Sequence, residues 1–264
     1  MSHIDSHEAM LRQVPLATAA VGWQTLPHRS PLHRHPAVPP APLAGWPGAI
    51  KRATDIAVAL LTLGVHIPLL LAVAIAIKLD SRGPVLFLQR RIGVNGQAFA
   101  LLKFRTMQHQ PPAAESLAPG SPIPLWPTPG AAAFPLRQTC PHDPRVTRVG
   151  ALLRRTSLDE LPQLWNVLRG EMSLVGPRPH APGTCAGGTP FEQVSDRYAL
   201  RHRVRPGMTG LAQVRGWRGQ TDTEEKLLRR LDSDLEYIAA WSLWLDCIIL
   251  ARTVATVLRM RNAY

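Results

Sequence analysis

The stretch from Ile56 to Ile77 restricts how this chain can fold more than any other. Its 22 residues are predominantly apolar, and as one straight helix they would extend about 33 Å, enough to cross a bilayer. Pro68 lies near the middle of the run, close to His66. Because proline lacks a backbone N–H and its ring clashes with the preceding turn, the helix should kink or break there. Each arm would then be too short to span a membrane.

Basic residues flank this run on both sides, at Lys51, Arg52, Lys78 and Arg82. The positive-inside rule therefore provides no asymmetry to support a crossing. We expect residues 50–82 to form a re-entrant membrane helix hairpin that enters one leaflet, turns at Pro68 and leaves on the same side. A kinked single span and a buried core helix are the alternatives.

Two proline-rich stretches divide the rest of the chain. Residues 1–49 contain seven prolines between Pro27 and Pro47, and residues 108–141 contain nine. Neither stretch shows the periodic apolar pattern of a packed helix or strand. We therefore predict a disordered tail over 1–49, and a surface insertion over 108–141 within a domain that extends over 83–264.

The net charge of the chain is +12, with 30 Lys and Arg against 18 Asp and Glu. Such a charge suits a phosphorylated substrate, anionic lipid head groups or nucleic acid. No helix-turn-helix, RNP or zinc-ligand pattern accompanies it, so we do not expect nucleic acid as a partner. Cys140, Cys185 and Cys247 are odd in number and widely spaced. They predict neither a disulfide framework nor a zinc site, which fits a reducing compartment.

The C-terminal region is helical by pattern. Leucines at three- and four-residue spacing predict an amphipathic surface helix over 227–238. The chain is more apolar over 241–258, although Asp246 and Arg252 interrupt that stretch. Trp241 and Trp244 suit a helix that lies in the membrane interface, with a core helix of a soluble domain as the alternative. The apolar run near the N-terminus favours the interfacial helix.

Two adjacent carboxylates, Asp159 and Glu160, follow the arginine pair Arg154 and Arg155. A carboxylate is a competent nucleophile toward phosphorus only if cations offset the repulsion between two anions, so this pattern indicates chemistry on a phosphate. The same residues also form a capping-box pattern, in which Ser157 would accept from the amide of Glu160. The two interpretations are compatible, because a helix N-terminus also binds phosphate.

Six short segments follow one another in the order found in one known family. They are residues 78–85, 89–93, 103–107, 143–147, 156–163 and 175–179. With these segments the chain resembles the bacterial sugar transferase family, the monotopic polyprenyl-phosphate phosphoglycosyl transferases, over roughly 50–264. The resemblance implies a mixed α/β, mainly helical monotopic membrane protein with interfacial amphipathic helices. It also implies a catalytic domain on the cytoplasmic face of the bacterial inner membrane, and an anchor that breaks at a proline, as Pro68 would.

The resemblance implies roles for individual residues as well. Asp159 matches the nucleophile of the family, and Glu160 matches its partner carboxylate. The residues that match the family's contacts to the phosphate and nucleotide of the substrate are Arg154 and Arg178, with Pro177 and Pro179 on either side of the second arginine. Mg²⁺ is the metal of the family, and Asp159 would lie near it.

Residues 210–223 are similar to the branch that transfers glucose 1-phosphate to undecaprenyl phosphate in exopolysaccharide assembly, with Gln220 where a Glu is frequent. This implies UDP-glucose as donor and UMP as product, with UDP-galactose as the nearest alternative. A loop that ends in a helix cap at Thr221 or Asp222 would explain part of the same segment. A non-catalytic membrane scaffold of a polysaccharide assembly complex is the alternative from another class. A homo-oligomer is compatible with the sequence.

Overall fold

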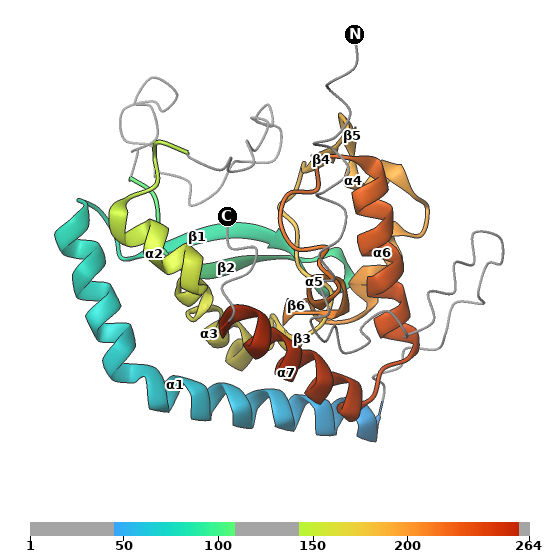
Figure 1. Ribbon diagram of the computed structural model, residues 1–264. Helices are drawn as coiled ribbons and strands as arrows, with labels where there is room; N and C mark the ends of the chain where they lie inside the picture. The colour runs from blue at the N-terminus through green and yellow to red at the C-terminus, as the bar shows by residue number, and fades with distance from the viewer. Residues whose placement is uncertain (1–44, 109–142, 259–264) are drawn as a thin grey trace, which may run out of the picture. The chain divides into compact units, whose positions relative to one another are not determined.

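The computed structural model describes residues 45–108 and 143–258 of the chain. Helices predominate over short strands (Figure 1), which confirms the predicted mixed α/β, mainly helical fold. Most of the predicted tail and of the predicted insertion lie outside the described ranges. The elements are α1 (Trp46–Asp80), β1 (Leu86–Ile92), η2 (Val94–Gly96), β2 (Ala98–Phe104), α2 (Arg148–Thr156), η4 (Leu158–Glu160), α3 (Gln163–Arg169), β3 (Ser173–Val175), β4 (Cys185–Ala186), β5 (Thr189–Pro190), α4 (Phe191–Val194), η5 (Tyr198–Arg203), β6 (Gly207–Thr209), α5 (Leu211–Val214), α6 (Glu224–Ala239) and α7 (Leu243–Leu258).

The apolar run belongs to α1, a single helix with Pro68 inside it. Figure 1 shows that α1 bends sharply and consists of two arms. A proline has no N–H to donate to the carbonyl of Gly64, four residues earlier, and its ring pushes that turn open. The predicted kink is therefore confirmed, although the two arms belong to one continuous helix rather than to two helices joined by a turn. The helix also begins at Trp46, within the segment that we predicted as tail.

Most side chains of α1 are exposed. Only 11% of the residues in its most apolar 18-residue window are buried, and α1 is the one helix of the described residues that is long and apolar enough to cross a membrane. Leu61 and Val65 are each 68% exposed, whereas Ala59 and Ile77 belong to a narrow buried stripe. A core helix of a soluble domain would bury such residues, so that alternative does not fit.

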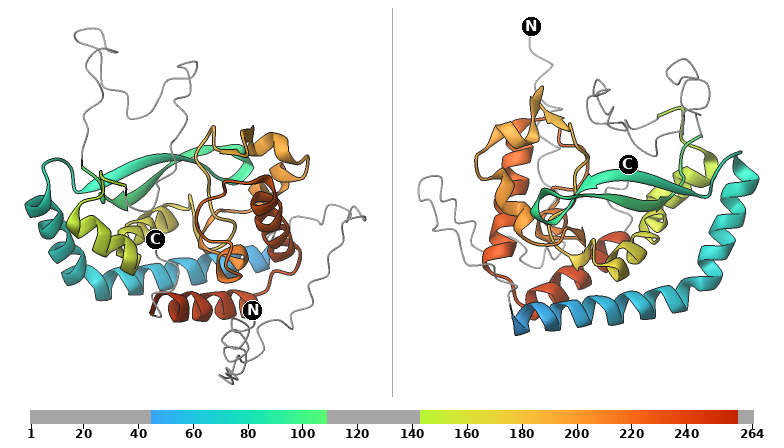
Figure 2. Two further views of the ribbon diagram at one scale, coloured as in Figure 1. Left: turned by 45° about the horizontal axis from the view of Figure 1, so that its top comes forward. Right: turned by 180° about the vertical axis from the view of Figure 1, so that it is seen from behind.

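A buried cluster of charged groups joins the N-terminal arm of α1 to α7, which lies beside it in both views (Figures 1 and 2). The ammonium group of Lys51 lies 2.9 Å from Asp55 Oδ1 and 3.0 Å from Asp246 Oδ2. The hydroxyl of Tyr237 donates to Asp246 at 2.9 Å, and the amide of Leu174 donates to Asp55 at 3.2 Å. Each buried charge is thus paired, as burial requires. Asp246, which we interpreted as an interruption of an apolar segment, instead fastens α7 to α1.

The C-terminal arm of α1 is fastened to the end of β2. Arg105, which is buried, donates to the backbone oxygen of Ser81 at 2.7 Å and to its hydroxyl at 2.9 Å. The carboxylate of Asp80 accepts from the amide of Val149 at the start of α2, at 3.1 Å. These contacts place the bent helix at a fixed position relative to β2 and α2.

The predicted C-terminal helices are present as α6 and α7. The cap of α6 is Thr223, whose hydroxyl accepts from the amide of Lys226, rather than the predicted Thr221 or Asp222. Leu227 and Leu231 are buried within the domain. The apolar side of α6 is therefore not available to a membrane. In α7, by contrast, Trp244 is 75% exposed.

Candidate active site

The two adjacent carboxylates lie in η4, a short 3₁₀ helix directly after α2. Ser157 joins the two helices with a left-handed backbone, φ 58°, which reverses the chain direction after α2. Its hydroxyl caps no helix and accepts instead from Arg218 at 2.8 Å. The capping-box interpretation is therefore wrong, because Ser157 ends one helix instead of starting an α-helix.

Asp159 is buried, with 7% of its surface exposed. Burial and the neighbouring charge of Glu160 raise its pKa to about 6, against the opposing effects of Lys103, Arg154 and Arg178. A carboxylate with a raised pKa that is surrounded by cations is a common property of reactive sites. The sequence-based prediction that arginines surround this carboxylate agrees with this arrangement.

Glu160 forms an ion pair with Arg178, in which both guanidinium NH groups point to the two carboxylate oxygens. Burial favours the protonated form of Glu160, but the charge and hydrogen bond of Arg178, together with the charges of Arg218 and Lys103, lower its pKa to about 2. The two neighbouring carboxylates thus differ in acidity. Glu160 therefore stays ionised at physiological pH, whereas the pKa of Asp159 lies near the physiological range.

Cations converge on the carboxylates from several elements. Lys103 comes from β2, which packs against η4. Burial lowers the pKa of Lys103, and the negative charge of Asp159 acts in the opposite direction. Arg154 comes from α2, and its Nε donates to the hydroxyl of Thr106 at 2.8 Å. Such an arrangement can bind an anion with more than one phosphate.

The backbone around Arg178 is held by close contacts between the residues that follow β3 and the chain at the start of β6. Gly207 donates from its amide to the carbonyl of Pro177 at 3.0 Å. A Cβ atom on Gly176 would lie 2.6 Å from the carbonyl oxygen of Arg205, so only glycine fits there. Pro177 and Pro179 line a cavity of about 10 Å³, the size of one water molecule. These prolines therefore shape the backbone next to Arg178 without enclosing a larger space.

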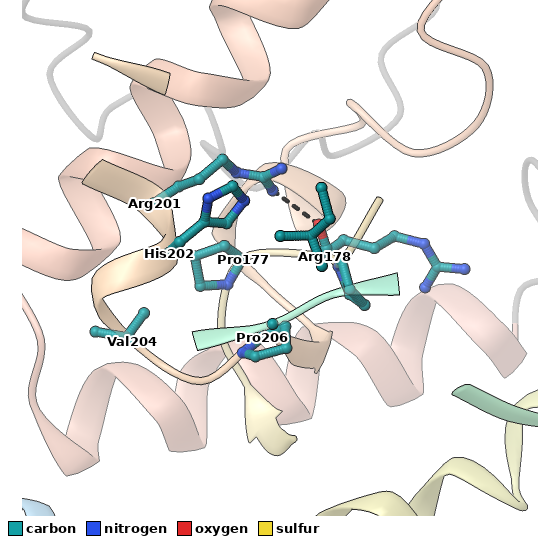
Figure 3. A pocket seen from close by; sticks show the side chains of 9 residues that line it. Pro177, Arg178, Arg201, His202, Val204 and Pro206 are labelled. Atoms are coloured by element: carbon teal, nitrogen blue, oxygen red, sulfur yellow. Dashed lines mark hydrogen bonds between the residues drawn. The ribbon is translucent and has the colours of Figure 1, made fainter. Parts of the chain in front are cut away.

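Arg201 supports Arg178 from the opposite side. Its guanidinium donates to the backbone oxygen of Arg178 at 2.8 Å, and Figure 3 shows the side chain of Arg178 pointing away from it. Arg201 is itself 2% exposed and bonded to Asp234 at 2.7 Å. Burial and the charge of Arg201 lower the pKa of His180, which therefore packs here as a neutral ring. This buried network fixes the position from which Arg178 reaches Glu160.

No group of three or more His, Cys, Asp or Glu side chains able to hold a metal lies within residues 45–108 and 143–258. Mg²⁺ does not need such a group, because it commonly binds one or two carboxylates together with substrate phosphates. Asp159 is an oxygen ligand of this kind, and Glu160 beside it is occupied by Arg178. The residues therefore fit an ion that is held jointly by Asp159 and a bound diphosphate.

The structure brings together four of the residues singled out in the sequence, Arg154, Asp159, Glu160 and Arg178. Pro68 lies elsewhere, inside α1. Sequence reasoning missed two cations, Lys103 and Arg218, as parts of the site. The signal for Lys103 was its place in one of the six matching segments, and the signal for Arg218 was its place in residues 210–223.

Comparisons with known proteins show which family the sequence matches. A model of the family described as bacterial sugar transferase matches residues 46–260. An undecaprenyl-phosphate glucose phosphotransferase of Komagataeibacter xylinus is 49% identical over 223 residues, which cover 84% of this chain and 38% of the relative. A UDP-glucose:undecaprenyl-phosphate glucose-1-phosphate transferase of Escherichia coli K12 is 46% identical over 213 residues, which cover 81% of this chain and 41% of the relative. The chain thus spans about two fifths of the length of these two relatives.

A shorter relative matches nearly end to end. The exopolysaccharide production protein PSS of Rhizobium leguminosarum bv. phaseoli is 48% identical over 209 residues, which cover 79% of this chain and 95% of the relative. The residues that match the family model contain α1 and the cluster around Asp159.

Proposed function

Since the chain belongs to the bacterial sugar transferase family, we propose that it transfers glucose 1-phosphate from UDP-glucose to undecaprenyl phosphate and releases UMP. This would be the initiating step of exopolysaccharide or capsule assembly. The observation that carries the proposal is the buried carboxylate of Asp159 among Lys103, Arg154 and Arg178. The names of the two longer relatives support glucose as the sugar. UDP-galactose or another UDP-hexose is the alternative donor.

In the proposed mechanism, a carboxylate oxygen of Asp159 attacks the phosphorus that carries the sugar. The bond from that phosphorus to UMP breaks, UMP leaves, and an aspartyl phosphosugar remains on the enzyme. An oxygen of undecaprenyl phosphate then attacks the same phosphorus and releases the Asp159 carboxylate. The cations around Asp159 support both steps, because they offset the repulsion between the nucleophile and the diphosphate.

Bound Mg²⁺ would neutralise part of the diphosphate charge, as in other phosphoryl transfers. Asp159 and the diphosphate would hold it. Arg154 and Arg178 would bind and orient the diphosphate oxygens that the metal leaves free.

Glu160 has two conceivable roles in this scheme, as a general base for the acceptor and as a positioning group. A general base works best when its pKa lies near the operating pH. The pKa of Glu160 is about 2 because Arg178 and other cations surround it. We therefore propose that Glu160 positions Arg178 and keeps it directed at the diphosphate.

We propose that α1 anchors the protein in the inner membrane as a re-entrant helix, with the catalytic domain on the cytoplasmic face. The exposed apolar surface of α1, its bend (Figure 1) and the proline inside it support this placement. Trp244 on α7 would lie in the interface, since α7 runs beside the N-terminal arm of α1 (Figure 2). Membrane lipid would then cover surface that is otherwise exposed to water.

A screen of UDP-sugars tests the reaction directly. Purified protein in a membrane mimetic with undecaprenyl phosphate and Mg²⁺ should release UMP from UDP-glucose faster than from UDP-galactose. A preference for UDP-galactose would change the sugar and keep the reaction class. Absence of UMP release from every UDP-sugar would favour the non-catalytic scaffold.

The rate of UMP release should fall as the pH drops through about 6. Attack requires the ionised form of Asp159, and its pKa is raised from 3.8 to about 6 by burial and by the charge of Glu160. Below that pH the carboxyl group becomes protonated and is lost as a nucleophile. The pH dependence of kcat/KM measures this property of the free enzyme. An acid limb near the ordinary value of 3.8 would contradict the burial argument.

Both ends of α1 should be accessible from one side of the membrane. Single cysteines placed at residues 45–50 and at residues 85–95, in a background without the native cysteines, should react with an impermeant thiol reagent only from the cytoplasmic side. Replacing Pro68 with Ala restores the missing backbone donor, so α1 should straighten and activity should fall. Labelling of the two regions from opposite sides would contradict the re-entrant placement.

A further inference from the structure

A second, larger cavity lies in the loop between α5 and α6. Its volume is about 330 Å³, and its lining consists of Gly216, Trp217, Arg218, Gln220, Asp222, Lys226 and Arg230. Small-molecule sites typically measure about 300–1,000 Å³, so this cavity is at the lower end of that range. It has room for one ring of a nucleotide sugar rather than for the whole molecule.

The loop that forms this cavity is held in place by hydrogen bonds from α6. Arg230 of α6 is buried, and its guanidinium donates to the carbonyls of Trp217 at 2.8 Å and Gly219 at 3.0 Å. Gly216 and Gly219 have φ values of 93° and 106°, a conformation in which other residues are strained. The walls of the cavity are thus built by specific contacts, which favours a defined ligand over a chance depression in the surface.

The cavity is linked to the neighbourhood of Asp159 and Glu160 through Arg218. This residue lines the cavity, and its NH2 group donates at 2.8 Å to the hydroxyl of Ser157, two residues before Asp159. The charge of Arg218 also acts on Glu160. A ligand whose phosphate meets Asp159 can therefore extend past Arg218 into the cavity.

The lining combines an aromatic ring with groups that donate hydrogen bonds and groups that accept them. The partly buried Trp217 offers an apolar face, Gln220 offers an amide, and Asp222 offers a carboxylate. The ammonium group of Lys226 forms an ion pair with Asp222, with 2.6 Å between Nζ and Oδ1. A hexose has matching features, since the C–H groups of one ring face are apolar and its hydroxyls both donate and accept hydrogen bonds.

We propose that this cavity receives the sugar ring of the UDP-sugar donor, with the ring against Trp217 and its hydroxyls hydrogen-bonded to Gln220 and Asp222. The proposal rests on the reaction proposed above. In an in-line displacement the leaving group lies opposite the attacking oxygen. UMP therefore lies on the far side of the phosphorus from Asp159, whereas the sugar oxygen is a lateral substituent that can turn toward Arg218.

The test separates binding of the sugar from binding of the nucleotide. The KM for UDP-glucose and the inhibition constant of UMP are measured for the wild type, Trp217→Ala, Trp217→Phe and Asp222→Ala. We expect the KM to rise about tenfold or more in Trp217→Ala and in Asp222→Ala, because each loses a sugar contact. Trp217→Phe should retain most of the affinity, and inhibition by UMP should stay within about twofold of the wild type throughout.

Asp232→Ala is the matched control, since Asp232 is also an exposed acid but lies on α6 and pairs with Arg197, which does not line the cavity. It should leave both constants unchanged. Asp222 is exposed, so Asp222→Ala keeps the proposal testable if Trp217→Ala fails to fold. Equal weakening of UMP inhibition and of the KM would assign the cavity to the nucleotide and overturn the proposal, as would unchanged constants in both cavity variants. Failure of the wild type to release UMP from any UDP-sugar would instead overturn the reaction itself.

Discussion

Asp159→Asn should abolish UMP release from UDP-glucose, even when no undecaprenyl phosphate is present. The amide has nearly the same shape as the carboxylate but is a poor nucleophile, so the first step is blocked. By analogy with other nucleophile replacements, we expect a loss of roughly 10⁴-fold or more in kcat. Single-turnover release of UMP measures the step directly.

The fold should survive this change. Asp159 is buried, and its raised pKa shows that the fold disfavours its charged form. Replacing the carboxylate with a neutral amide removes this unfavourable buried charge. We expect Asp159→Asn to unfold at a temperature equal to or higher than that of the wild type, measured below and above pH 6. A folded variant with near-normal activity would show that the nucleophile has been assigned wrongly.

Arg178→Ala should lower kcat/KM by about 10²–10³-fold, the effect of removing one group that stabilises charge in a transition state. Its guanidinium pairs with Glu160, and the buried Arg201 holds its backbone in place. Loss of the side chain removes a phosphate ligand and leaves the charge of Glu160 without its ion-pair partner. Steady-state kinetics with UDP-glucose measures the effect.

Two further variants show whether the Arg178 effect is specific. Arg178→Lys keeps the charge but loses the bidentate contact with Glu160. Its activity should therefore lie between those of the wild type and Arg178→Ala. Arg215→Ala removes a surface arginine that pairs with Glu236 at 2.6 Å and should change activity by less than about twofold. Equal losses in Arg178→Ala and Arg215→Ala would indicate a general effect of charge and contradict the proposed role.

Features set by local pattern could be predicted from the sequence. Periodic leucines located α6, and the proline inside the apolar run located the bend of α1. The neighbourhood of Asp159 and the two arginines was also predictable, because Arg154 and Asp159 lie close in sequence and the family resemblance supplied Arg178.

Features that depend on distant contacts were missed. Lys51 looked like a basic flank of the apolar run, yet it pairs in the interior with Asp246, almost 200 residues away. Ser157 satisfied the capping-box pattern, but its left-handed backbone turns the chain, and a partner 61 residues away occupies its hydroxyl. No periodicity reports such pairings, since they arise only when α1 meets α7 and when the end of α2 meets the loop before α6.

The covalent step is the central claim of this account, and trapping the intermediate tests it most directly. Protein incubated with Mg²⁺ and UDP-glucose carrying a labelled glucose, in the absence of undecaprenyl phosphate, should acquire the label in amounts equal to the UMP released. Peptide mapping should place the hexose phosphate on Asp159, and later addition of undecaprenyl phosphate should discharge it into lipid. Release of UMP only when both substrates are present, with no label on the protein, would contradict the account.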